Sequence, residues 1–475
     1  MKQAFTRAAG IRGPSEALFP PWPERQRIDD YLTRELARAQ ERVAAGSATP
    51  TLDMDAFRRE LAGFDFAAPR PLPALLDWSV GMLEHGVVHL THSRYFGLFN
   101  PNPSFPSQCA DRIVGSFNPQ VASSATSPAA VALEAHVIRM VAQRAGLPAQ
   151  SGGHFTSGGS EANYTALLCA LTRAHPQFAT DGARAFPGPP VFYASKECHR
   201  SWVKIAHQAG IGRSAARLVA TDGSGRMATT ALAAAIAADL ASGCIPVLIV
   251  ASAGTTNAGV IDPLPDCAEL AQRHGLWYHV DAAWGGAMIA SEKLRSVLTG
   301  LERADSATID AHKWFATTMG CGMFLVRDAG ALSAVFQVAA SYMPSHEMSV
   351  DPYMNSAQWS RRFLGLRLFL SLASAGWEGH AAHIERAVEQ AARIRQGLES
   401  RGWSVVNDSP LAVLTVVPPP ALGCPRTIVE RVLKSGRAWV SLARFEERDV
   451  VRICVTHGET SEEDLSILLE ALTRV

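Results

Sequence analysis

The sequence lacks the charge surplus and the long apolar runs that mark several classes of protein. Its 475 residues carry 44 basic and 44 acidic side chains, so the formal net charge is zero. A protein that binds nucleic acid or an anionic membrane usually has a basic surplus, and we therefore expect neither partner. No uninterrupted apolar run reaches the roughly 18 residues that suggest a membrane-spanning helix. The sequence therefore predicts a soluble protein.

Paired cysteines are also missing. The eight cysteines are scattered along the chain, and no two of them form a Cys-x-x-Cys motif. Such scattering is typical of reduced thiols in a cytoplasmic protein, so we expect a cytoplasmic location and no metal site. The first seven residues, Met1–Arg7, lack the apolar core of a signal peptide, which agrees with that location.

The most informative segment is Ser306–Phe315, which contains Lys313 in a mainly apolar setting. A lysine that forms a Schiff base must lose its proton near neutral pH, and burial or nearby positive charge favours that loss. Asp310 and His312 are the polar neighbours of Lys313 in this segment, and its other neighbours are apolar. An isolated lysine of this kind more often ends a buried strand and extends its amine to water. Other motifs are needed to decide between the two.

Asp281 follows a β-rich run, Trp277–Val280, after a helix-like stretch that stops at Gly275. We expect its carboxylate at the carboxyl end of a strand, where ligands gather in open α/β sheets. A carboxylate there can keep a pyridine nitrogen protonated, although an aspartate that caps the next turn is common too. Small residues that we expect to leave room for a flat ring follow it: Ala282, Ala283, Gly285 and Gly286.

Glycines and hydroxyl residues open a predicted helix that continues through Ala174. The segment Phe155–Ala162 reads Phe-Thr-Ser-Gly-Gly-Ser-Glu-Ala. Backbone N–H groups at such a helix start favour a phosphate dianion, although most Gly/Ser turns are only helix caps. The order along the chain, with a phosphate loop, then an aspartate, then a lysine, is much harder to obtain by accident.

These motifs together resemble those of the group II pyridoxal phosphate (PLP)-dependent amino-acid decarboxylases, which include the aromatic-L-amino-acid, tyrosine, histidine and glutamate decarboxylases. The similarity runs from about Tyr95 to the C-terminus. It implies a fold-type I PLP-dependent enzyme with a mainly parallel seven-stranded sheet covered by helices. The implied division is a helical N-terminal segment at a dimer interface (1–96), a large PLP-binding α/β domain (97–370) and a small C-terminal α+β domain (371–475). A homodimer is expected, because helices that cannot bury their apolar faces need a partner.

The resemblance assigns roles position by position. Lys313 resembles the Schiff-base lysine, and Asp281 resembles the aspartate paired with the pyridine nitrogen. The other positions taken as cofactor-binding are Gly159 and Ser160 in the phosphate loop, Thr256 near the ring hydroxyl, Ala283 on the ring, His199 stacked on the opposite ring face, Asp310, and His312 before the lysine. Tyr342 falls where the family keeps a tyrosine on a loop, and we expect it to protonate Cα, with His199 assisting. Tyr342 is alternatively an ordinary amphipathic tyrosine at a domain edge.

The implied reaction is decarboxylation of an L-amino acid to the corresponding amine and CO₂. Two other outcomes of PLP chemistry stay open, an aminotransferase and an oxygen-using aldehyde synthase. A non-catalytic paralogue is disfavoured, because Lys313, Asp281 and His199 are all present. Arg361 and Arg362 either bind a carboxylate or phosphate or are helix-surface charges.

The segment His89–Pro103 matches part of the family's substrate pocket. Aromatic residues in it would favour an apolar or aromatic substrate side chain: Tyr95, Phe96 and Phe99. Basic residues in it would instead suit an acidic amino acid: His89, His92 and Arg94. Asn102 could touch substrate or cofactor. Aromatic residues at this density are more often part of a core, so the substrate class stays open.

Overall fold

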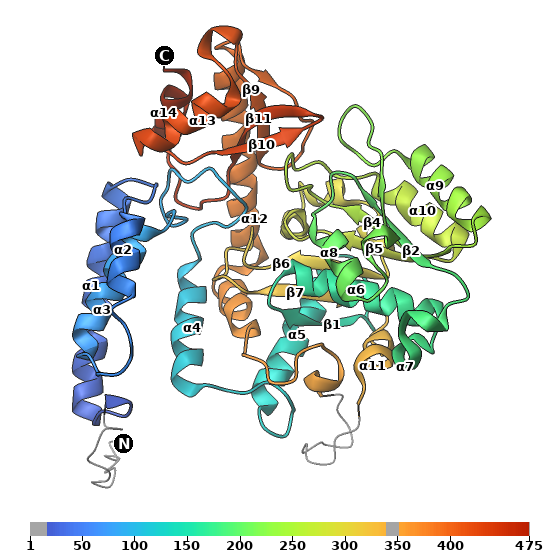
Figure 1. The fold of residues 1–475 in the computed structure, drawn as a ribbon, viewed down its shortest axis with the longest axis horizontal. Helices are drawn as coiled ribbons and strands as arrows, with labels where there is room; N and C mark the ends of the chain where they lie inside the picture. Colours follow the sequence, from blue (N-terminus) through green and yellow to red (C-terminus); the bar gives the residue numbers. More distant parts are fainter. Residues whose placement is uncertain (1–16, 339–350, 475) are drawn as a thin grey trace.

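The structure is a computed structural model that describes residues 17–338 and 351–474, so the predicted catalytic Tyr342 lies outside the described residues. In Figure 1 the N-terminal helices stand as a column beside an α/β body, and a small C-terminal sheet lies above them. No helix within the two described ranges is long and apolar enough to cross a membrane.

A seven-stranded sheet forms the centre of the body, in the order β1-β7-β6-β5-β4-β2-β3. Strands β3, β2, β4, β5 and β6 run parallel, and β7 is antiparallel to both of its neighbours. The prediction of a mainly parallel seven-stranded sheet is therefore confirmed. The strands are β1 (Gly152–Thr156), β2 (Pro190–Ser195), β3 (Ala216–Val219), β4 (Ile245–Ser252), β5 (Trp277–Asp281), β6 (Ser306–Asp310) and β7 (Gly322–Val326).

Every residue of β2, β5, β6 and β7 is buried, as expected when helices cover both faces of a parallel sheet. The connecting helices return the chain across the sheet, so the carboxyl ends of the parallel strands meet at one edge. The helices of the α/β body are α4 (Phe105–Phe117), α5 (Pro128–Arg144), α6 (Gly159–Ala174), α7 (Phe178–Asp181), α8 (Ser201–Gln208), α9 (Thr229–Ala241), α10 (Leu264–His274) and α11 (Gly330–Phe336). Helix α10 ends at Gly275, whose φ of 67° is left-handed, so the stop signal in the sequence acts as expected.

Short 3₁₀ turns connect several of these elements. They are η2 (Gly182–Ala185), η3 (Arg213–Ala215), η4 (Gly285–Ala290), η5 (Arg295–Leu298), η6 (Leu301–Arg303), η7 (Pro352–Met354) and η8 (Pro420–Leu422).

The C-terminal part begins with α12 (Gly365–Glu399), which is broken at Gly376, where φ is 64° and ψ is 177°. An antiparallel four-stranded sheet follows in the order β10-β11-β9-β8. Its elements are β8 (Ser404–Val405), β9 (Val413–Val417), α13 (Pro425–Ser435), β10 (Ser441–Phe445), β11 (Arg448–Cys454) and α14 (Glu462–Thr473). A capping box between Ser461 and Asp464 starts the last helix.

The N-terminal helices bury very little of themselves in this chain. They are α1 (Trp22–Ala45), α2 (Met54–Leu61) and α3 (Leu72–Gly86). Within them only Ala39 is buried, although α1 packs along α3. These helices therefore present much of their apolar surface to the outside.

Candidate active site

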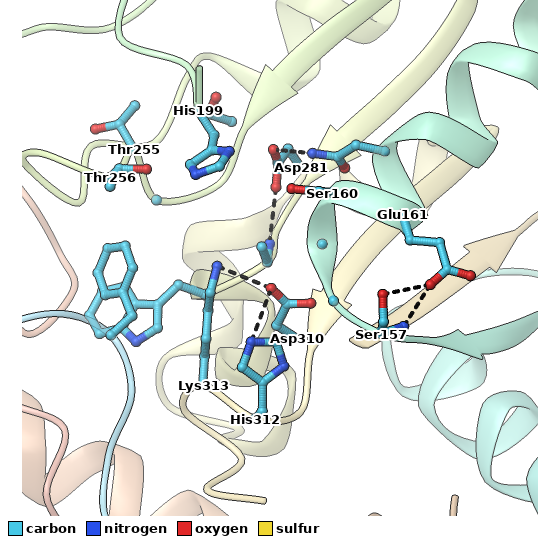
Figure 2. A pocket seen from close by; sticks show the side chains of 18 residues that line it. Ser157, Ser160, Glu161, His199, Thr255, Thr256, Asp281, Asp310, His312 and Lys313 are labelled. Atoms are coloured by element: carbon cyan, nitrogen blue, oxygen red, sulfur yellow. Dashed lines mark hydrogen bonds and ion pairs between the residues drawn. The ribbon is translucent and has the colours of Figure 1, made fainter. Parts of the chain in front are cut away.

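A cavity of about 310 Å³ lies where the carboxyl ends of β4, β5 and β6 meet the start of α6. The last residues of these strands, Ser252, Asp281 and Asp310, all line it. Every predicted cofactor residue lines it too: Gly159, Ser160, His199, Thr256, Asp281, Ala283, Asp310, His312 and Lys313. Figure 2 shows these side chains converging from separate strands and from α6. The fold thus brings together residues that are more than 150 positions apart in the sequence.

The predicted phosphate loop turns directly from β1 into α6. Helix α6 begins at Gly159 and has no side-chain cap, so the N–H groups of its first two residues, Gly159 and Ser160, are open to a ligand. A Cβ atom at Gly159 would lie 2.9 Å from Oδ2 of Asp310, so a side chain there would collide with the carboxylate. The loop therefore needs glycine at this position to pack against the segment that carries Lys313.

The carboxylate of Glu161, in this loop region, already has several hydrogen-bond donors. Oε2 of Glu161 accepts hydrogen bonds from the backbone N–H and the hydroxyl of Ser157, at 2.8 and 2.7 Å (Figure 2). Gln358, from the segment before α12, donates its side-chain amide to both carboxylate oxygens of Glu161. Glu161 is thus held at the pocket edge by partners other than the lysine.

Asp281 is fixed through one of its two carboxylate oxygens. Asn163 Nδ2 donates to Oδ2 over 2.8 Å, and Trp202 Nε1 donates to the same oxygen over 3.2 Å. Oδ1 receives only the backbone N–H of Ala283, at 3.3 Å. Asp281 thus caps the following turn only through this long hydrogen bond. Its Oδ1 can still accept a hydrogen bond from a protonated ring nitrogen.

A buried polar network supports Asn163 from behind. Its Oδ1 accepts from the Thr308 hydroxyl at 2.7 Å and lies 3.2 Å from Nε2 of His279. Nδ1 of His279 lies 2.8 Å from the hydroxyl of Ser306, which also accepts from Trp277 Nε1. Burial lowers the pKa of His279 to about 4, so the ring is neutral at pH 7 and donates from Nε2 to Asn163.

The amine of Lys313 faces a carboxylate. Its Nζ lies 3.1 Å from Oδ2 of Asp310, and Nε2 of His312 lies 3.9 Å from the same oxygen (Figure 2). The two polar neighbours expected from the sequence, Asp310 and His312, are thus the ones that gather at the amine, and the ring centroid of Phe99 lies 5.7 Å from Nζ. The apolar neighbours in the sequence point into the core instead: Ile309, Ala311, Trp314 and Phe315.

His199 presents one ring nitrogen to the open part of the pocket. Its Nδ1 lies 2.7 Å from the hydroxyl of Ser201 and accepts the backbone N–H of that residue at 3.3 Å. A nitrogen that accepts an N–H carries no proton, so the neutral ring is protonated at Nε2. His199 is therefore a hydrogen-bond donor toward the pocket.

Aromatic rings form one wall of the pocket. Phe99 stacks on Trp284 with ring centroids 4.4 Å apart, and Trp284 stacks on Trp314 at 4.2 Å. The guanidinium of Arg452, from β11, covers the other face of Phe99 at 4.6 Å. Arg452 is 2% exposed, donates to the backbone oxygens of Thr256 and Gly97, and has one Nη atom without a hydrogen-bond partner in the described ranges.

Several residues expected in or beside the pocket lie elsewhere. Tyr95 and Phe96 are buried in the core, at 2% and 0% exposure, which is the more common setting for aromatic residues at this density. His89 and His92 are buried against the N-terminal segment, where they contact backbone oxygens of Glu84 and Gly46. Of the small residues after Asp281, only Ala283 lines the cavity. Gly285 and Gly286 instead allow close packing against Ala253 and Ile309.

The two consecutive arginines after the undescribed segment have different settings, and neither lines the cavity. Arg361 is buried and pairs with Glu134 at 2.6 Å, while Glu134 also accepts the backbone N–H groups that begin α12. Arg362 is exposed and pairs with Asp111. Arg361 is therefore structural, and Arg362 is a surface charge.

Sequence reasoning missed Asn163, Trp202 and Arg452. Asn163 lies inside a helix, where asparagine is unfavourable because its side chain competes for backbone hydrogen bonds. That anomaly was the signal that could have singled it out. No local pattern marks Trp202 or Arg452, whose partners are 79 and 196 positions away.

The sequence matches a known protein family. The family model described as "Pyridoxal-dependent decarboxylase conserved domain" matches residues 67–412. The L-2,4-diaminobutyrate decarboxylase of Rhizobium meliloti (strain 1021) is 33% identical over 333 residues, which cover 70% of this chain and 65% of that enzyme. The aromatic-L-amino-acid decarboxylase of Bacillus atrophaeus is 29% identical over 441 residues, which cover 88% of this chain and 89% of that enzyme. The chain therefore spans slightly less than two thirds of the first relative and most of the second.

A solved structure has the same fold. The crystal structure of mouse CSAD superposes with a TM-score of 0.86 at 26% identity, covering 94% of this chain and 98% of that one. The likeness extends through both the central sheet and the C-terminal part.

Proposed function

The chain belongs to the pyridoxal-dependent decarboxylase family, and we propose that it converts an L-amino acid to the corresponding amine and CO₂. The observation that carries this proposal is the convergence of Lys313, Asp281 and the uncapped start of α6 around one cavity. Each of the three supplies what one part of PLP requires: an amine for the aldehyde, a carboxylate for the ring nitrogen and N–H donors for the phosphate.

The residues present fit the cofactor. Oδ1 of Asp281 has spare accepting capacity, Ala283 lines the cavity beside it, and Gly159 leaves the start of α6 without a side chain. When bound, PLP draws electrons from the bonds at the substrate's Cα. Lys313, Asp281, Gly159 and Ser160 are the residues that we propose hold it, with Thr256 beside the ring.

The chain's own groups would select the bond that breaks. His199 lines the cavity, and Ser201 engages only its Nδ1, so we propose that its Nε2–H holds the substrate carboxylate. The aromatic wall of Phe99 and Trp284 excludes water, which favours loss of a charged carboxylate as neutral CO₂. We propose that Tyr342, which lies outside the described residues, returns a proton to Cα.

We propose a substrate with an aromatic or apolar side chain, supported by the position of Phe99 and Trp284 on the pocket wall. Arg452 supports an acidic substrate as the second candidate. Its guanidinium is buried behind Phe99, no carboxylate pairs with it in the described ranges, and one of its nitrogens has no partner there. A rearrangement of Phe99 would bring an acidic side chain within reach of this charge.

We also propose that the protein is a homodimer built on its N-terminal helices. Large apolar side chains are exposed along α1 to α4 and the chain before them: Leu18, Phe19, Trp22, Leu36, Met54, Leu61, Leu72, Leu83, Phe105, Ile113 and Phe117. A monomer rarely leaves so many exposed on adjoining elements, and a second copy would cover them. Sedimentation equilibrium tests this proposal, and a monomer at micromolar concentration would contradict it.

The proposed division of the chain stays at 1–96, 97–370 and 371–475. The break in α12 at Gly376, close to the second boundary, supports it. The proposed cytoplasmic location is supported by the eight free cysteines.

One experiment separates the candidate reactions. The purified protein is supplied with PLP and each of the twenty amino acids, and the products are identified. A decarboxylase gives amine and CO₂ in equal amounts, and an aminotransferase gives a keto acid and an amino group on a second substrate. An oxygen-using aldehyde synthase also releases CO₂, but with aldehyde, ammonia and peroxide in place of the amine. A Lys313→Ala variant is the control, and none of these products from the wild-type protein would contradict the proposal.

A further inference from the structure

Asp310 is the charged group nearest to the amine of Lys313 in the part of the chain that the structure describes. Its carboxylate is 2% exposed, and its Oδ2 lies 3.1 Å from the lysine Nζ. Oδ1 is buried without a hydrogen-bond partner among the described residues. The pairing with Lys313 is therefore the main compensation for burying this carboxylate.

The carboxylate of Asp310 is confined to its position. A Cβ atom at Gly159 would lie 2.9 Å from Oδ2, and one at Gly322 would lie 2.6 Å from Oδ1. The two glycines therefore form a close-fitting slot for the carboxylate. The lysine has a long flexible side chain that is 20% exposed, so it is the partner that moves when the pair opens.

No other titratable group around the slot, among the described residues, takes the place of either partner in the Asp310–Lys313 pair. Nε2 of His312 is farther from Oδ2, at 3.9 Å. Burial raises the pKa of the Cys321 thiol to about 12, so it is neutral. Two more carboxylates line the cavity, but Glu161 is bound by Ser157 and Gln358. The remaining one, Asp281, is bound by Asn163 and Trp202.

We propose that Asp310 is the counter-ion that receives Lys313 whenever the lysine amine is not bonded to the cofactor. An ammonium group has no lone pair, so the lysine must leave this pair and release a proton to solvent before its amine can act as a nucleophile. The pair equally stabilises the lysine when an incoming amine displaces it. Asp310 is thus a positioning residue that favours the free lysine over the cofactor-bound lysine.

The inference rests on Lys313 being the cofactor lysine, but its first test requires neither cofactor nor turnover. Cofactor-stripped protein is treated briefly with limiting acetic anhydride at pH 7, and acetylation of Lys313 is measured by mass spectrometry. Acetylation of the exposed Lys204 in the same digest is the internal standard. Asp310→Asn should acetylate at Lys313 about tenfold faster than wild type, because the charged hydrogen bond is lost.

Glu161→Gln is the matched control, because it removes another carboxylate from the same cavity that does not touch Lys313. It should leave the labelling rate of Lys313 at the wild-type value. An Asp310→Asn rate equal to that of wild type would overturn the inference, as would an equal acceleration in Glu161→Gln. If the Asn variant does not fold by circular dichroism, Asp310→Ser gives the same test.

A second readout uses the protein loaded with PLP. Hydroxylamine removes the cofactor from the lysine, and the visible absorbance of the bound cofactor follows its loss. Without the carboxylate the released lysine is less stable, so Asp310→Asn should lose cofactor several-fold more slowly. Equal or faster loss would contradict the proposal. If the protein proves to have another activity, the acetylation result still decides the role of Asp310.

Discussion

Asn163, in the second turn of α6, donates its side-chain amide to Asp281 over 2.8 Å. The same helix that offers its first N–H groups to the proposed phosphate site therefore also fixes the proposed ring-binding carboxylate. Because one rigid helix carries both functions, their spacing is set by the geometry of α6.

Replacing Asn163 by Ala should destabilise the protein by about 1–3 kcal/mol. The change removes a donor to Asp281 and leaves Thr308 and His279 without their buried acceptor. Urea unfolding followed by circular dichroism measures the effect. Asn102→Ala, whose amide makes a long contact with Glu459 at the surface, should shift stability by less than about 0.5 kcal/mol. An Asn163→Ala midpoint equal to that of Asn102→Ala would contradict this account.

Arg361 and Arg362 are adjacent in the sequence but differ in burial, so their alanine variants compare a buried ion pair with an exposed one. Arg361→Ala leaves Glu134 buried without its ion-pair partner and should cost about 3–5 kcal/mol. Arg362→Ala removes only an exposed pair with Asp111 and should cost no more than about 1 kcal/mol. Thermal or urea unfolding of the two variants compares them directly. Equal losses would contradict a buried Arg361–Glu134 ion pair that stabilises the fold.

Stability should fall on mild acidification because buried histidines must take up protons. Burial lowers the pKa of His154 to about 3 and that of His380 to about 4, from 6.5 in the unfolded chain. Below pH 6.5 the unfolded state therefore binds more protons than the folded state, and each histidine costs about 2 kcal/mol by pH 5. The loss continues until the pH reaches the folded pKa.

His154→Leu tests this pH dependence most cleanly, because neither ring nitrogen of His154 has a hydrogen-bond partner among the described residues. The variant should lose less stability than wild type between pH 7 and pH 5, by about 2 kcal/mol in urea unfolding. His136→Leu, an exposed position on α5, should keep the wild-type dependence. An unchanged slope in His154→Leu would be inconsistent with a neutral buried ring.

Ser201 should affect the reaction rate because its hydroxyl helps to orient the imidazole ring of His199. Ser201→Ala removes the hydroxyl 2.7 Å from Nδ1 of His199 but keeps the backbone N–H bond, so the ring loses part of its constraint. We expect a three- to tenfold fall in kcat/KM, with Ser201→Thr close to wild type. Nitrogen NMR of His199 should show protonation at Nε2 in both proteins, because the backbone N–H bond to Nδ1 remains in Ser201→Ala. A wild-type rate in Ser201→Ala would remove the role of the hydroxyl.

Much of the fold was predictable from local signals. The glycine after His274 ends α10, and the Gly-Gly-Ser run starts α6 at Gly159, both as expected. The motifs around Asp281 and Lys313 also predicted which residues meet at the cavity, since each follows a parallel strand and strand ends share one edge.

Sequence patterns failed where the contact is made by distant elements. The sequence leaves open whether Tyr95 and Phe96 belong to the pocket or to the core, and the C-terminal part decides this by covering them, with Trp439 stacked on Tyr95. Arg452 reaches the site from β11, and nothing near it in the sequence indicates this. Such contacts depend on how the C-terminal part packs on the central sheet, which local periodicity does not encode.

The most direct test of the proposed function identifies the lysine to which PLP is covalently bonded. The protein is saturated with PLP, reduced with borohydride, digested and analysed by mass spectrometry. We expect a phosphopyridoxyl group on Lys313 and on no other lysine. An unmodified Lys313 under excess PLP, or the group attached elsewhere, would contradict the proposed function at its base.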